Sequence, residues 1–217
     1  MLHPTRFSRA FTLIEMLVVM AVIAILAAII LSVNGLVQSK AARARAETEI
    51  KALSAGCESY KGDNGSYPQD ATTDALDPRA NGAPAGYNAA SVSLYKALSG
   101  DTNANGRLDA ATEGKNYAPD FFQPQRLGGA IGPNGAMTSV TFIKDPYGNS
   151  YGYSTIGAKA EQDYITKVKT DASAARPAVK GYNSTFDLWS TAGKTTNPIA
   201  GDIGKSKDIT NIWVKNW

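Results

Sequence analysis

A single carboxylate, Glu15, interrupts an otherwise uncharged apolar run between residues 11 and 33. Placing an ionised carboxylate in a membrane-spanning helix costs about 2.5–3.5 kcal/mol on insertion scales, so such a residue indicates a function. If the chain is cut before Phe11, a new α-amino group appears four residues before Glu15. We expect this amino group to pair with the Glu15 carboxylate of a neighbouring copy, because pairing neutralises two charges inside an apolar bundle.

A second pattern that could do chemistry lies between residues 101 and 109. Oxygen-bearing side chains alternate along it and a glycine follows them, which is typical of a loop that wraps a hard cation such as Ca²⁺. The candidate ligands are Asp101, Asn103, Asn105, the backbone carbonyl of Arg107, and Asp109. The EF-hand pattern requires an acid at its twelfth position, where this chain has Thr112 and then Glu113. The same residue types also favour a turn without metal, so both interpretations stay open.

The remaining residues exclude several classes of protein. His3 is the only histidine, and a cut before Phe11 would remove it, which would rule out a histidine-dependent triad or a His-ligated zinc site in the mature chain. Cys57 is the only cysteine, so no intramolecular disulfide forms. The formal net charge is +3 without a dense Lys/Arg block, which indicates no nucleic-acid binding. We therefore expect that the chain is not an enzyme.

The elements that position Glu15 begin with a predicted transmembrane helix over residues 11–33. A bilayer core needs roughly 20 apolar residues in helical form, and this run meets that length. Arg6 and Arg9 precede it, which predicts a cytoplasmic N-terminus and a C-terminal domain in the periplasm or outside. Hydropathy alone favours an uncleaved signal anchor.

The residues around Glu15 resemble the prepilin peptidase signal shared by type IV pilins and type II secretion pseudopilins. Ala10-Phe11-Thr12-Leu13-Ile14-Glu15 stands between a basic leader and the apolar helix. The resemblance implies a leader peptide at residues 1–10, cleavage between Ala10 and Phe11, N-methylation of Phe11, and a role for Phe11 and Glu15 in assembly. The family mostly has Gly where this chain has Ala10.

Beyond the apolar run the pattern predicts an α+β domain. The helix continues through residues 34–61, and Ile50, Leu53, Cys57 and Tyr60 form an apolar stripe along it. Residues 62–217 form the globular domain, with a loop-rich insertion at 69–135 and a helix at 91–100. A small antiparallel sheet in residues 136–217 is expected to pack on the helix, with strands at 138–143, 150–156 and 181–190.

Three C-terminal segments resemble the major pseudopilin of type II secretion: KDPYGNSYGY, FDLWSTAG and DITNIW. The resemblance implies a calcium site in the loop before the last segment. Asp208 matches an acidic ligand of that site, and the carbonyl of Thr191 matches a backbone ligand. The expected acid after the strand is absent, and Asp202 is the candidate replacement. This loop and residues 101–109 are rival locations for Ca²⁺.

The resemblance implies a structural subunit of a secretion pseudopilus, anchored in the bacterial inner membrane and then assembled into a periplasmic filament. Its expected partners are further copies of the chain, other pseudopilins, prepilin peptidase and the inner-membrane assembly platform. A type IV pilin acting in adhesion, motility or DNA uptake is the first alternative; many such pilins close a loop with two cysteines. A membrane-tethered enzyme or binding module is the second, and it predicts that Glu15 is dispensable.

Overall fold

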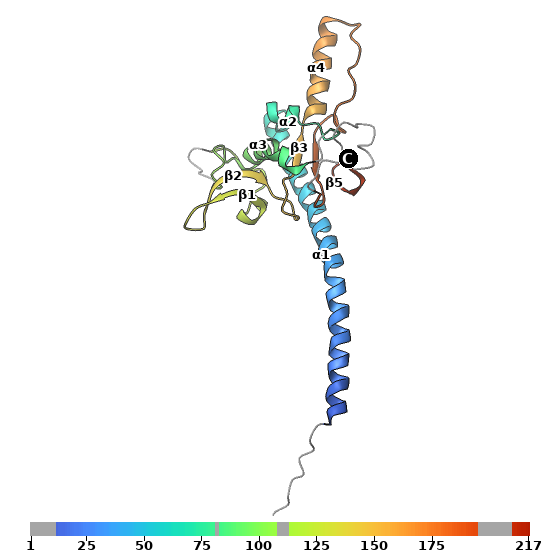
Figure 1. The fold of residues 1–217 in the computed structure, drawn as a ribbon. Helices are drawn as coiled ribbons and strands as arrows, with labels where there is room; N and C mark the ends of the chain where they lie inside the picture. Colours follow the sequence, from blue (N-terminus) through green and yellow to red (C-terminus); the bar gives the residue numbers. More distant parts are fainter. Residues whose placement is uncertain (1–11, 81–82, 108–112, 195–209) are drawn as a thin grey trace, which may run out of the picture. The chain divides into compact units, whose positions relative to one another are not determined.

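The computed structural model describes residues 12–80, 83–107, 113–194 and 210–217, and the backbone alone of residues 30–36 (Figure 1). The chain divides into two compact units, Met1–Ala41 and Ala42–Trp217. Helix α1, Leu13–Asn64, runs through this boundary. The compact domain therefore begins within the helix, at Ala42.

The first unit presents an exposed apolar helix. Every side chain described between Thr12 and Ile29 is exposed, and Leu13 reaches 84 %. No helix in the described part of the chain is both long and apolar enough to cross a membrane. The predicted span 11–33 lies partly outside the described residues, at residue 11 and at the side chains of residues 30–33.

In the second unit the apolar stripe of α1 forms one wall of the core, as predicted. Ile50, Leu53 and Cys57 are buried, and Tyr60 packs against the same cluster. Burying a side chain such as that of Leu53 contributes about 1.5–3 kcal/mol. Burial also raises the pKa of the Cys57 thiol, so this cysteine is a packing residue rather than a reactive thiolate.

The segment predicted as a loop-rich insertion, residues 69–135, is more regular than expected. It contains α2 (Ala71–Ala75), α3 (Asn88–Ser99), two 3₁₀ turns (Pro84–Tyr87 and Pro124–Arg126) and β1 (Leu127–Ile131). Helix α3 confirms the expected helix at 91–100. Strand β1 was missed because its sequence, LGGAI, contains two glycines that weaken strand propensity. Tertiary packing selects the strand instead: the Phe142 ring occupies the space that a side chain at Gly128 would need.

Two small antiparallel sheets replace the single sheet that was expected. Strand β1 pairs with β2 (Met137–Ile143), which confirms the predicted strand at 138–143. The other sheet has the order β3-β4-β5, formed by Gly152–Ser154, Asp187–Ser190 and Val214–Lys215. The first hairpin begins at Leu127, so it crosses the predicted boundary between the insertion and the sheet region. The α+β class is confirmed as a mixture of helices and small antiparallel sheets.

Two predicted strands are wrong over most of their length. The strand expected at 150–156 is reduced to β3, and the chain continues at Ile156 into α4, Ile156–Thr170. The strand expected at 181–190 is reduced to β4. The β-branched pair at Thr155 and Ile156 suggested a longer strand, but the following AKAEQDYITKVK is rich in helix formers. Figure 1 shows α4 projecting from the end of β3.

Candidate functional site

The candidate assembly site is the N-terminal turn of α1, where Thr12 and Glu15 bond reciprocally. Glu15 Oε2 accepts the backbone N–H of Thr12 and its Oγ1–H, each at 2.8 Å. The Glu15 N–H donates in return to Thr12 Oγ1 at 3.2 Å. This arrangement is a capping box, which satisfies two of the donors that a helix N-terminus leaves unpaired. The carboxylate also lies at the positive end of the helix dipole.

The capping box gives Glu15 a role within a single copy that sequence reasoning missed. The signal was present, because Thr12-Leu13-Ile14-Glu15 is a T-x-x-E pattern directly before an apolar helix. The residues of the expected cleavage site, Ala10 and Phe11, lie outside the described residues. Glu15 therefore has donors from its own subunit before any neighbour arrives.

The loop at 101–107 is organised around the buried carboxylate of Asp101. Its Oδ1 accepts the N–H of Asn105 at 3.2 Å, and its Oδ2 accepts the N–H of Gly106 at 2.7 Å. The hydroxyl of Tyr95 also donates to Oδ2, at 2.6 Å. Burial and the negative charge of Asp101 raise the pKa of Tyr95, which keeps this hydroxyl a donor.

The two asparagines of this loop accept backbone N–H groups two residues ahead. Asn103 Oδ1 accepts from Asn105 at 2.9 Å, and Asn105 Oδ1 accepts from Arg107 at 2.8 Å. Gly106, at φ +81°, supplies the left-handed backbone that the turn requires. Carboxylate and amide oxygens are the donors that suit a hard cation, and the turn is also complete without one. The fifth candidate ligand, Asp109, lies outside the described residues.

The rival loop follows β4. Thr191 is buried, its carbonyl accepts the N–H of Lys194 at 3.2 Å, and its Oγ1 donates to the Lys194 carbonyl at 2.6 Å. The proposed backbone ligand is therefore already bonded within a turn. Asp202 and Asp208 lie outside the described residues. Over the described ranges, no three side chains among His, Cys, Asp and Glu come together as a metal site.

The turn at 145–149 is tied to the end of β4 by a buried carboxylate. Asp145 Oδ1 accepts the N–H groups of Tyr147 and Asn149 at 3.0 and 2.7 Å, and Oδ2 accepts the hydroxyl of Ser190 at 2.5 Å. Burial is the main cause that raises the pKa of Asp145. Two of the segments that carry the C-terminal resemblance, KDPYGNSYGY and FDLWSTAG, are thus joined by a direct contact.

A third buried carboxylate, Glu49, was not identified from the sequence. It is 4 % exposed and accepts the hydroxyl of Tyr151 at 2.9 Å. Arg45 and Arg126 lie 3.4 and 3.7 Å from its Oε1. The sequence around Glu49 is typical of a charged, solvent-facing helix, so only the approach of Tyr151 and Arg126 from distant parts of the chain reveals the burial. This network is a structural ion pair that positions the hairpin on α1.

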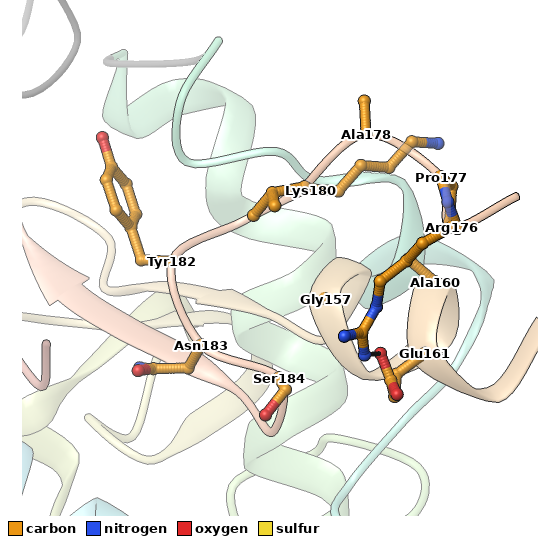
Figure 2. Close-up of a pocket in the computed structure, with 11 residues that line it drawn as sticks. Gly157, Ala160, Glu161, Arg176, Pro177, Ala178, Lys180, Tyr182, Asn183 and Ser184 are labelled. Atoms are coloured by element: carbon orange, nitrogen blue, oxygen red, sulfur yellow. Dashed lines mark hydrogen bonds and ion pairs between the residues drawn. The ribbon is translucent and has the colours of Figure 1, made fainter. Parts of the chain in front are cut away.

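A hollow of about 340 Å³ lies beneath the segment that returns from α4 (Figure 2). Glu161 and Arg176 form an ion pair at its edge. The residues lining it do not include a predicted site residue. The hollow is therefore separate from both the assembly site and the candidate cation loops.

Comparison with known proteins identifies the N-terminal segment. Residues 5–31 match the family model described as the prokaryotic N-terminal methylation motif. Neither the curated proteins nor the solved structures include a match to the chain. The matched residues contain the expected cut after Ala10, the capping box and most of the exposed apolar helix. The chain therefore carries the prepilin-type signal of the type IV pilin and pseudopilin class at its N-terminus.

Proposed function

We propose that this chain is a structural subunit of a type II secretion pseudopilus, cleaved before Phe11, methylated there and polymerised through α1. The observation that carries the proposal is the methylation motif at residues 5–31, within which Glu15 caps the helix that follows. In the proposed cycle the subunit waits in the bacterial inner membrane with its N-terminus cytoplasmic and its domain periplasmic. Prepilin peptidase, the assembly platform and other pseudopilins are its partners.

In this proposal, assembly replaces the hydrogen-bond donors of the Glu15 carboxylate: donors from its own subunit give way to a donor from a neighbouring subunit. In a single copy the N–H and hydroxyl of Thr12 satisfy Glu15, so the helix does not enter the membrane with a bare carboxylate. In the filament the α-amino group of a neighbouring Phe11 takes over as the partner. The exposed apolar side chains between Thr12 and Ile29 pass from lipid to neighbouring helices, which cover them in turn.

The assignment to the secretion branch is supported by the C-terminal half of the domain. The Asp145–Ser190 bond joins two of the segments that resemble the major pseudopilin. Cys57 is the only cysteine of the chain, so the chain lacks the cysteine pair that closes a loop in many type IV pilins.

Deletion of the gene in its native host tests whether the chain serves a secretion pseudopilus or a type IV pilus. We expect exported proteins to accumulate in the periplasm, because a pseudopilus subunit drives their final step across the outer membrane. Surface pili, motility and DNA uptake should be retained at wild-type levels. Loss of pili or motility with unchanged secretion would contradict the proposal and support the type IV pilin alternative.

We further propose that the domain binds Ca²⁺, at the loop 101–109 or at the loop carrying Thr191, Asp202 and Asp208. Binding at 100 times the Kd stabilises a fold by about 2.7 kcal/mol, so calcium should raise the melting temperature of the full chain in detergent. Asp101→Asn and Asp208→Asn are matched variants, and the one that abolishes the calcium-dependent shift marks the site. An unchanged wild-type melting temperature on adding calcium would refute calcium binding at both loops.

A further inference from the structure

The segment between Arg176 and Ser184, here named the strap, returns from α4 and passes over the first turns of that helix. Figure 2 shows the strap on one side of the 340 Å³ hollow, with Gly157, Ala160 and Glu161 of α4 on the other. Arg79 holds the middle of the strap by donating to the carbonyl of Val179 at 2.5 Å. The strap therefore spans open space and is held at discrete points.

The two ends of the strap are each fixed by a carboxylate. At the first end, Arg176 pairs with Glu161 at 2.5 Å, and the Arg176 side chain is exposed. At the second end, Asp187 Oδ2 accepts the N–H of Tyr182 at 2.8 Å and Oδ1 accepts the N–H of Asn183 at 2.9 Å. The strap packs closely against α4 at Asn183. A side chain at Gly157 of α4 would collide with the Asn183 carbonyl, so only glycine fits there.

In the closed position the strap covers the Asp187 carboxylate and shields it from water. It is 1 % exposed and begins β4, where it faces Ser154, the last residue of β3. The segment that contains α4 and the strap therefore begins and ends at this pair of neighbouring residues. Lifting the strap would expose the Asp187 carboxylate to solvent.

Burial, together with one nearby acid, disfavours the ionised form of Asp187. Burial is the main cause that raises its pKa from 3.8 to about 6, against the opposing effect of the two backbone N–H groups. Asp77, from the segment after α2, adds repulsion. Further charged residues on the adjoining segments are Arg79 beside Asp77, Arg176 and Lys180 of the strap, Lys159, Glu161 and Asp163 of α4, and Lys215 of β5. Among these, Asp77 is the acid whose charge acts on Asp187.

We propose that the strap is a pH-responsive closure, held shut more firmly in acid than at neutral pH through the carboxylate of Asp187. In the open state Asp187 is solvated and returns toward its ordinary pKa of 3.8, whereas the closed state holds a proton up to about pH 6. The closed state therefore binds more protons between these values, so closure is favoured as the pH falls toward 4 and weakens as it rises through 6. This inference does not depend on filament assembly.

Amide hydrogen exchange of the full chain in detergent, followed by mass spectrometry, tests the closure. Protection factors of peptides covering residues 176–186, corrected for intrinsic exchange, should be about 25-fold higher at pH 4.5 than at pH 7.5. Asp187→Asn should show the same protection at both values. Asp171→Asn is the matched control, because Asp171 is an exposed carboxylate between α4 and the strap. This variant should keep the full rise in protection at pH 4.5.

A second variant keeps the test decisive if Asp187→Asn folds poorly. Asp77→Asn removes the like charge that raises the Asp187 pKa, so the pH at which protection begins to rise should move downward. Equal protection at both pH values in the wild type would overturn the proposal. A rise that persists unchanged in both Asp187→Asn and Asp77→Asn would also overturn it, because the responsive group would then be another residue.

Discussion

Glu15→Ala is expected to abolish filament assembly while leaving the protein inserted in the membrane and cleaved before Phe11. In the proposed filament the substitution removes the carboxylate that would pair with the Phe11 amino group of the next copy, and an unpaired charge in an apolar bundle costs several kcal/mol. That cost recurs at every subunit, so the loss should be complete rather than partial. Filaments sheared from cells and counted by electron microscopy, with membrane fractions probed in parallel, give the measurement.

Two companion variants separate pairing between copies from capping within one copy. Glu15→Gln retains an acceptor for the Thr12 N–H but lacks the charge, so it should also fail to assemble. Thr12→Val removes the hydroxyl and keeps the carboxylate, which weakens the helix cap by about 1 kcal/mol and should permit assembly. Normal filaments in Glu15→Ala would remove the pairing argument and favour a plain membrane anchor.

Leu53→Ala is expected to lower the free energy of unfolding of the second unit by about 2–5 kcal/mol. Leu53 is fully buried in the apolar stripe of α1, among residues that include Leu94 and Leu98 of α3. Truncation leaves a cavity where the helix and the domain meet, and total stability is only about 5–15 kcal/mol. Urea unfolding of the full chain in detergent, followed by tryptophan fluorescence of the buried Trp189 and Trp213, measures the change.

Lys51→Ala is the matched control for this effect, since Lys51 is exposed two residues earlier on the same helix. It should change the free energy of unfolding by less than about 0.5 kcal/mol. Equal effects of the two substitutions would show that the stripe of α1 does not carry the packing of the domain.

The helix and its chemistry were predictable because their signals are local. An apolar run, one carboxylate and a T-x-x-E pattern lie within consecutive residues, and the stripe from Ile50 to Tyr60 follows the helical period. The strand at 138–143 was equally evident, since TSVTFI is rich in β-branched residues. The turn at 101–107 was visible as Asn, Asp and Gly at fixed offsets.

The missed features are those that depend on partners far apart in the chain. Strand β1 forms from a glycine-rich segment because β2 pairs with it and Phe142 covers it. Glu49 becomes buried because Tyr151 and Arg126 approach it from other elements. The carboxylate of Asp145 accepts the hydroxyl of Ser190, a residue far away in the chain, and local sequence spacing does not encode that contact.

The sequence by itself determined the N-terminal signal, the long helix and the class of the domain, because periodicity and a single misplaced charge are properties of neighbouring residues. Only the tertiary structure decided that two sheets form instead of one, that Glu49 is buried, and that α4 and the strap lie between β3 and β4. The physical reason is that burial and hydrogen-bond geometry arise where the folded chain brings groups together, and that outcome overrides local propensity.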